Sequence, residues 1–450
     1  MNSPYSILDA SLTSGDITLD IRSSIIEFQT FEHIGKPYVD ATIAFVDDFG
    51  LINALSIKGT EIFTITMGDV SSDSTAAFTK YFFVSKIIDT HKVNERSEMV
   101  SVQLVEDTVY VDAVKQISKS YRGTIEDMIS TIASNELNKT VVYDEEFEGS
   151  AQGPRNIVVP YMSPLQAIQW VKDRATSKTG APIYLRASLY TDDLILSDFD
   201  SHMKRDPFNK KLPLRYTSAI SSVDDIDVDK TSYYSIKAYS NASSNNMLRQ
   251  YEMGNVGSYY NNLDAGTGFS SGEHVSIRDI VDEFYLTELI SYDTVQTMFD
   301  PELLIGDKLS DEYNSLNVFQ ITSSNTYNQY ASYHDETVVV DDNNNISESK
   351  LKIKNKIIRA MLKKNMMDIG IDGRTIFGNQ VTTGDKVRAI FLSSDVSADN
   401  KDEIDQIDRS KSGDYFILAI NHIFKPLDES HVVQLRMTKI GELSPMDIEI

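Results

Sequence analysis

Cysteine is absent from this sequence of 450 residues. Disulfide bonds, thiol catalysis and thiolate metal sites are therefore excluded together. Long apolar runs are absent as well: no stretch is long enough to cross a bilayer, so we expect a soluble protein. The first residues also lack a basic segment followed by an apolar one, and no secretory signal is expected. The length suggests about two to four domains.

Positive charge is scarce. Asp and Glu number 67 against 42 Lys and Arg, which leaves a formal net charge of -25. Because affinity for nucleic acid comes largely from Lys and Arg that neutralise phosphates, tight or sequence-specific DNA binding is not expected. Two interpretations stay open: an acidic surface past which DNA slides without sticking, and acidity that simply keeps the protein soluble.

Sequence motifs of catalysis are missing too. The seven histidines form no His-Glu-x-x-His zinc motif, and no Gly-x-Ser-x-Gly nucleophile elbow occurs. His422 and His431 fall on two expected strands near the end of the chain, where packing or a surface position explains them better than catalysis. Paired carboxylates for glycoside cleavage stay open, because their separation exists only in space. We predict no enzyme, and no catalytic or cofactor-binding residue.

Three polar stretches are candidates for ligand binding, and each has a simpler interpretation. The glycines of Gly266–Gly272 have the wrong spacing for a dinucleotide loop and favour a flexible loop. Asp341–Asn345 resembles the start of a calcium loop, but Ile346 replaces the glycine and Lys352 stands where a bidentate Glu belongs. The third stretch is an acidic alternation that could bind a cation, or form a solvated face or the wall of a channel: Asp225, Asp227 and Asp229. We predict no bound metal.

The sequence contains an internal repeat. Each copy has, in order, a glycine turn, a strand, a polar loop, a Tyr-Phe strand, a hairpin loop and a strand with alternating apolar and polar residues. Alternating apolar and polar residues are typical of a strand with one buried face. We expect Gly59 and Gly384 to take positive φ in the turns that enter these strands. The segments are Ile57–Thr66, Tyr81–Ile87 and Met99–Val105, then Val381–Phe391, Tyr415–Ile420 and Val432–Met437. The pattern predicts a duplicated domain whose copies close into small antiparallel barrels or sandwiches; the alternative is a chance likeness between two hairpins.

The flanking segments add strands before the first copy and helices after it. Strand-like alternation marks residues 17–21, 25–31 and 39–45. After the first copy the apolar period changes to three and four residues, which indicates helices. Two helices are predicted, from Val111 to Ile117 and from Ile125 to Leu137, separated at Tyr121–Gly123. Thr124 is the expected N-cap of the second.

A further helix is predicted from its start signal. Ser163 suits the N-cap, and Pro164 suits the first helical position. An aromatic and β-branched hairpin follows, with strands at 182–190 and 194–199. Residues 232–239 then read as the first strand of the second copy.

Several segments together carry a family resemblance. They are Gly59–Glu61, Val158–Pro164, Ile168–Val171, Gly180–Leu185, Ser412–Ile417 and Asn421–His422. In this order they resemble the central baseplate hub protein of T4-like contractile-tailed bacteriophages, and more distantly the hub half of type VI secretion spike proteins. The resemblance covers about residues 1–250 and 365–442.

The resulting prediction for the fold class is α+β, mainly β, with two similar antiparallel β-barrel-like tube domains, an α+β domain between them and an inserted subdomain. The domains are expected at 1–110 for the first tube domain, 111–205 for the α+β domain, 206–250 with 366–443 for a discontinuous second tube domain, and 251–365 for the insertion. The insertion is polar, so it is expected to face outward, with helical pattern at 277–290 and 353–361.

The resemblance implies a structural function. It predicts a homotrimeric symmetry adaptor at the centre of the baseplate, with the central spike protein on one side and the first tail-tube ring protein on the other. Other baseplate proteins are further possible partners, and viral DNA would pass through the lumen without specific binding. The expected location is the tail baseplate of the virion, assembled in the host cytoplasm without membrane insertion. Two alternatives are the hub of a type VI-like or tailocin injection device, and a glycan- or receptor-binding tail protein, suggested by 23 tyrosines.

Overall fold

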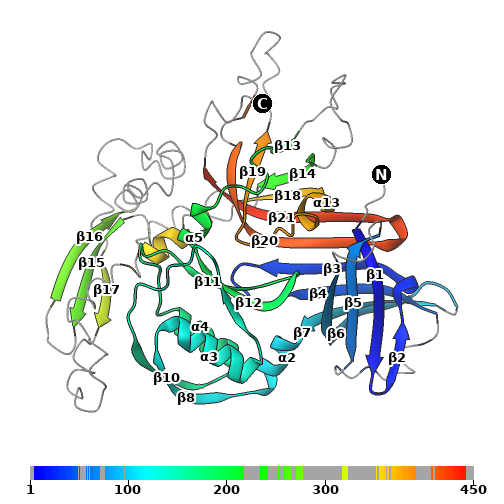
Figure 1. Ribbon diagram of the computed structural model, residues 1–450, viewed down its shortest axis with the longest axis horizontal. Coiled ribbons are helices and arrows are strands. Elements are labelled where there is room, and N and C mark those ends of the chain that lie inside the picture. The colour runs from blue at the N-terminus through cyan, green and yellow to red at the C-terminus, as the bar shows by residue number, and fades with distance from the viewer. Residues whose placement is uncertain are drawn as a thin grey trace, which may run out of the picture.

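Figure 1 shows a computed structural model of the protein, which is mainly β. It describes residues 5–48, 61–70, 77–95, 97–216, 234–241, 257–264, 270–276, 317–322, 354–360, 366–391 and 411–441, with a few single residues and pairs between them. Among these, no helix is long and apolar enough to cross a membrane. The acidic stretches around Asp227 and Asp341, and the helix expected at 277–290, lie outside the described residues.

Thirteen strands form one large sheet. Its order is β14-β18-β21-β20-β3-β4-β7-β6-β5-β1-β2, and β19 pairs with both β20 and β13. The N-terminal strands are β1 (Tyr5–Ser14), β2 (Ile17–Asp20), β3 (Ile25–His33), β4 (Asp40–Asp47), β5 (Ile62–Asp69), β6 (Phe78–Lys92) and β7 (Glu98–Glu106). The others are β13 (Leu214–Tyr216), β14 (Ile236–Asn241), β18 (Met366–Asp372), β19 (Lys386–Phe391), β20 (Gly413–Lys425) and β21 (Ser430–Gly441).

The sheet contains two sets of five strands that pair in the same order. We call β3-β4-β7-β6-β5 the first half-sheet and β14-β18-β21-β20-β19 the second half-sheet. Their irregularities coincide as well. The β3–β4 register shifts between Ile25 and Glu27, and the β14–β18 register shifts between Ile236 and Ala238. The half-sheets therefore share strand order, antiparallel direction and the position of a β-bulge, a feature that fixes local twist.

The expected pair of closed barrels is not found. The half-sheets are joined edge to edge, because β20 pairs with β3 as well as with β21. Within the described residues, the end strands of the second half-sheet, β14 and β19, do not pair with each other. β13 pairs with β19 and meets Ser235 through an isolated bridge at Arg215, and Tyr239 of β14 packs on Phe391 of β19 at 5.2 Å. Without a ladder between its end strands the half-sheet does not close, and one open sheet results.

The two Tyr-Phe strands, β6 and β20, are equivalent in the structure, but aligning their Tyr-Phe sequences places the equivalent residues one position off. Tyr81 and Tyr415 look equivalent in the sequence, yet Tyr81 is exposed and Tyr415 is buried. The register shift after Val84 in β6 corresponds to the one after Ile417 in β20, which makes Phe82 the counterpart of Tyr415. Both are buried, so equivalent residues of the two strands share a buried position and not the same residue type.

The glycine turns behave as predicted. Gly59 has φ +98° and Gly384 has φ +95°. A Cβ at Gly384 would lie 2.5 Å from the Cε1 atom of His202, so both the backbone conformation and the packing require glycine there.

The segment after the first half-sheet mixes helices and short strands. It contains α2 (Asp107–Val114), β8 (Ile117–Gly123), α3 (Ile125–Leu137), β9 (Val141–Tyr143), β10 (Arg155–Met162), α4 (Pro164–Lys172), β11 (Ile183–Ser188), β12 (Thr191–Asp198) and α5 (Phe199–Lys204). The predicted end of the first helix at Ile117 is wrong, because α2 ends at Val114. Ile117 begins β8 because residues 117–123 pair with β10, roughly 40 residues later in the chain, and such pairing leaves no trace in a local apolar period.

Helix start signals were read correctly. Thr124 is the N-cap of α3, and its hydroxyl accepts a hydrogen bond from Asp127 N at 3.2 Å. Ser163 is the N-cap of α4, with Pro164 at the first position. Asp112 of α2 also serves this end: its carboxylate accepts from the Ser163 hydroxyl at 3.0 Å and from the Leu165 amide at 2.6 Å. A side chain from another helix therefore caps α4.

The region expected as an insertion contains a separate sheet. β15 (Gly257–Asp264) lies between β16 (Ser270–Ser276) and β17 (Asn317–Thr322), at the left of Figure 1. Ser270–Gly272, expected in a flexible loop, belongs to β16. Residues 354–360 are helical, as the sequence indicates.

Candidate functional site: the joint between the half-sheets

The pairing of β20 with β3, which we call the joint, links segments from the two ends of the chain. In Figure 1 the red strands β20 and β21 lie beside the blue strands β3 and β4. The antiparallel ladder runs from Ala419 opposite His33 to Phe424 opposite Phe28. The joint therefore carries the hydrogen-bond network of the sheet from one half-sheet into the other.

Aromatic rings pack across the joint. Phe28 and Phe424 are stacked with their centroids 6.2 Å apart. Phe424 also stacks on His431, at 4.0 Å and 7° between planes. Phe377 of α13 (Gly373–Phe377) meets Phe424 edge-on at 6.0 Å. All four side chains are buried, and buried aromatic pairs of this geometry stabilise a core beyond their area alone.

Two histidines belong to the same cluster. His422 Nδ1 and His431 Nε2 form a hydrogen bond of 3.1 Å. Burial lowers the pKa of His422 to about 3 and holds the pKa of His431 well below its ordinary value. Both rings are therefore neutral at physiological pH. Of the two positions expected for them, packing or the surface, the structure shows packing.

Glu32 is a buried acid at the joint. The Thr382 hydroxyl donates to Glu32 Oε2 at 3.3 Å, and the Arg186 guanidinium donates to the Thr382 hydroxyl at 2.8 Å. Burial raises the pKa of Glu32 to about 7, against the opposing effect of Arg186. Its other oxygen lies 4.0 Å from His422 Nε2, and neither atom has a hydrogen-bond partner in the described structure. The first half-sheet, β11 and the turn before β19 thus meet at one acid.

This acid predicts a pH dependence. The pKa of Glu32 is about 7 in the folded protein against an ordinary 4.5, so the folded state binds more protons between these values. Stability therefore falls as the pH rises from 4.5 to 7, by about 3 kcal/mol for this group alone. Glu32→Gln is expected to lack that loss. Urea unfolding of both proteins across this pH range tests it, and parallel stability curves would contradict it.

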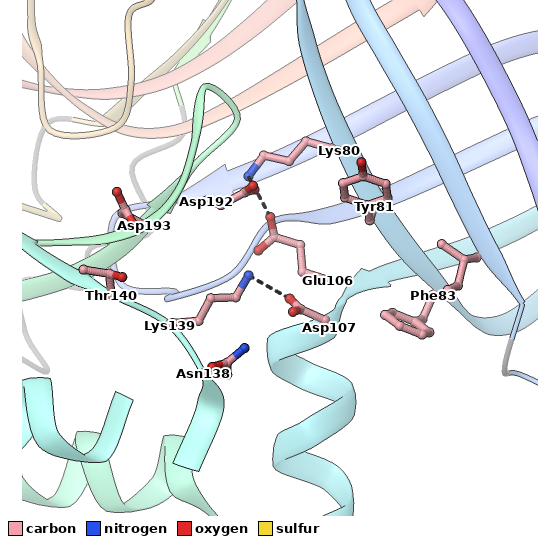
Figure 2. A pocket seen from close by; sticks show the side chains of 11 residues that line it. Lys80, Tyr81, Phe83, Glu106, Asp107, Asn138, Lys139, Thr140, Asp192 and Asp193 are labelled. Carbon is pink, nitrogen blue, oxygen red and sulfur yellow. Dashed lines mark hydrogen bonds and ion pairs between the residues drawn. The ribbon is translucent and has the colours of Figure 1, made fainter. Parts of the chain in front are cut away.

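A second polar cluster holds the first half-sheet to the middle segment. Lys80 Nζ donates to Glu106 Oε1 at 3.1 Å, to Asp192 Oδ1 at 3.0 Å and to the Thr191 carbonyl at 2.7 Å. The Val39 amide donates to the other oxygen of Glu106 at 3.0 Å. Figure 2 shows Lys80 pointing from β6 toward both carboxylates. We call this arrangement the Lys80 clamp.

Burial and charge act against each other in the Lys80 clamp. Burial by itself lowers the pKa of Lys80, but Glu106 and Asp192 outweigh it and leave the pKa above its ordinary value. Burial also raises the pKa of Glu106, with Lys80 opposing. The pair is therefore ionised only because its members face each other.

The Lys80 clamp lines a cleft of about 390 Å³. A second ion pair in this cleft also joins different elements, since Lys139 pairs with Asp107 at 2.8 Å (Figure 2). This is the arrangement of a structural clamp, in which each ammonium group is held by a carboxylate of another element. Among the described residues, no group of three or more His, Asp or Glu is placed to hold a metal ion.

Both polar clusters were missed from the sequence, although each left a signal. Lys80 alternates in sequence with Phe78 and Phe82, so it belongs to the same face of its strand, and Glu32 belongs to the same face as Phe28. A charged residue on the apolar face of an alternating strand predicts a buried partner. The alternation does not identify that partner.

Comparison with solved structures identifies the fold. A crystal structure of the tail protein from Neisseria meningitidis MC58 matches with a TM-score of 0.53 at 9% sequence identity, covering 97% of this chain and 97% of that chain. The chain shares the fold of this tail protein. The resemblance to tail proteins read from the sequence is thus supported at the level of fold.

Two further structures match with lower scores. A 43 kDa tail protein of prophage MuSo2 from Shewanella oneidensis has a TM-score of 0.49 at 10% identity, covering 96% of this chain and 98% of that chain. A component of the type VI secretion system from E. coli has 0.41 at 8%, covering 98% of this chain and 79% of that chain. No protein family and no curated protein matched the sequence.

Proposed function

We propose that the protein is the structural central hub of a phage tail baseplate, a homotrimer that joins a trimeric spike to the hexameric tail tube. The observation that carries the proposal is the internal repeat: two half-sheets with the same strand order and the same bulge, joined in one sheet. A trimer of such chains contains six half-sheets, so a three-fold assembly can present six similar surfaces. The fold shared with a tail protein supports the setting.

In this proposal the parts of the chain divide the work. Residues 1–110 form one tube domain, and residues 206–250 with 366–443 form the other. Residues 111–205 form the α+β domain that the Lys80 clamp holds to the first half-sheet. Residues 251–365 form a peripheral subdomain, to which β15–β17 belong.

The proposed partners are the central spike protein on one side of the ring and the first tail-tube ring protein on the other. Viral DNA passes through the lumen without specific binding. The net charge of -25 suits such a passage, because an acidic wall repels phosphate and keeps DNA from adhering. The role needs no catalytic residue, and the two buried charged clusters serve packing.

The assembly state tests the proposal. The purified chain is expected to form trimers in analytical ultracentrifugation, and negative-stain class averages without imposed symmetry should show six similar lobes around an open lumen. A chain that stays monomeric at the highest soluble concentration would contradict the trimer. A trimer with three lobes and no lumen would contradict the adaptor while leaving the oligomer intact.

A further inference from the structure

The joint suggests how one chain contacts the next. Within a chain, β20 pairs with β19 near its start and with β3 along the rest of the same edge, from Ala419 to Phe424. The counterpart of β20 in the first half-sheet is β6, and the counterpart of β3 in the second half-sheet is β14. If the same contact occurs between chains, β6 of one chain pairs with β14 of its neighbour.

Both edges lack a ladder partner over several residues among the described strands. Among the described strands, β5 pairs with β6 only as far as Phe83, and β6 continues to Lys92 with β7 as its one partner. β14 pairs with β18, and no other described strand forms a ladder with its opposite edge from Ile236 to Asn241. β13 reaches only the residue before β14, through the Arg215–Ser235 bridge, and its Tyr216 packs on the ring of Tyr239. Unpaired edges of this length favour pairing with another chain.

Burial at equivalent positions supports the pairing. Through their partners Val102 and Leu435, Ile87 of β6 corresponds to Ile420 of β20. Ile87 is 39% exposed, whereas Ile420 is 1% exposed. The apolar side chain of β6 lacks the cover that β3 supplies to β20.

The other edge shows the same contrast. Tyr239 of β14 corresponds to Phe28 of β3, since each lies opposite an isoleucine of the next strand at the same step after the bulge. Tyr239 is 36% exposed and Phe28 is fully buried. At both edges, a large apolar residue is exposed only where the joint has no counterpart within the chain.

We propose that β6 of one chain and β14 of the next pair antiparallel and extend the sheet between protomers, as β20 and β3 extend it within each. The proposal rests on the proposed trimer and specifies its contact. Transferred through the equivalent positions, the register places Thr90 opposite Asn241, His91 opposite Ser240 and Lys92 opposite Tyr239. The last pair would set an ammonium group beside an aromatic ring, a favourable contact. The two edges differ, so the contact is head-to-tail and forms a ring when its rotation closes.

Cysteine cross-linking of the full chain tests the pairing, and the native sequence contributes no background thiol. Opposite residues in an antiparallel pair lie about 4.5–5.5 Å apart at Cα, within disulfide range. We expect the His91→Cys, Ser240→Cys double variant to form a covalent trimer on mild oxidation, seen on a non-reducing gel. The adjacent pair Thr90→Cys with Asn241→Cys checks the register.

Two matched controls accompany these variants. Gln29→Cys with Ile423→Cys lies at the equivalent position of the joint and should form a disulfide within one chain, without oligomers. His91→Cys with Lys237→Cys is three residues out of register, about 10 Å along the strand, and should cross-link at least several-fold less.

The outcomes separate the two proposals. A trimer in ultracentrifugation without a cross-link from either adjacent pair would overturn the β6–β14 pairing and leave the hub function standing. A cross-linked ladder that extends beyond trimers would support the pairing and contradict the trimeric hub. A monomer without cross-links would overturn both.

Discussion

Replacing Lys80 with methionine is expected to destabilise the protein by about 4 kcal/mol. Methionine keeps most of the length of the side chain but removes the charge that Glu106 faces. Because Glu106 is buried, it would stand as an uncompensated charge or take up a proton. The loss should appear in urea unfolding as a lower midpoint.

The same strand offers a control for this variant. Lys86 is exposed on β6, and Lys86→Met is expected to change stability by less than about 0.5 kcal/mol. Adding Glu106→Gln to Lys80→Met should restore most of the loss, because no charge then remains buried. A Lys80→Met protein as stable as the wild type would show that the Lys80 clamp does not hold the middle segment.

The loss of stability in the Lys80→Met variant should be smaller at low pH. Without Lys80 the pKa of Glu106, already raised by burial, rises further in the folded state. A raised folded-state pKa favours folding below it and loses that contribution as the pH rises. The penalty should therefore be smaller at pH 5 than at pH 8.

Phe28→Ala is expected to cost about 4 kcal/mol. The ring is fully buried and contacts Phe424 and Phe82 at centroid distances of 6.2 and 6.0 Å, so its loss opens a cavity within the joint. Thermal unfolding should show a lower transition temperature. Phe31, three residues along the same strand and 37% exposed, is the matched control, and Phe31→Ala should cost about 1 kcal/mol or less.

The reverse ranking of these two phenylalanines would contradict the joint as a site of packing. Phe31 lies opposite Asn421 in the ladder, and Phe28 lies opposite Phe424. A joint held mainly by backbone hydrogen bonds would make the two variants similar. Packing of the rings predicts that they differ by about 3 kcal/mol.

Local features of the fold followed from the sequence. Alternation located β3–β7 of the first half-sheet and β14, β19, β20 and β21 of the second, and the turn glycines took the expected positive φ. Thr124 and Ser163 began their helices as predicted. These features depend on residues within a few positions of one another, which is why a single sequence contains them.

Long-range features did not follow. Ile117 was assigned to a helix because the pairing of β8 with β10 is invisible in a local period. Closed barrels were expected because the sequence does not reveal that β20 also takes β3 as a neighbour. Lys80 and Glu32 lie on the apolar faces of their strands, which indicates a buried charge. Two of the charged groups that they face, Asp192 for Lys80 and Arg186 for Glu32, lie more than a hundred residues away in the chain. Nine of the described strands were not predicted, namely β1, β8, β9, β10, β13, β15, β16, β17 and β18.

The joint also determines how late in translation β3 can pair with β20. β3 ends at residue 33 and β20 begins at residue 413, so the ribosome adds roughly 380 residues between the two strands. At about 5–20 residues per second, this takes about 20–80 s. During that interval one edge of β3 has no partner from its own chain, although β4, which pairs with the other edge, has long been made. One of the earliest strands to leave the ribosome is thus among the last to be completed, and protection of the nascent chain matters most at its beginning.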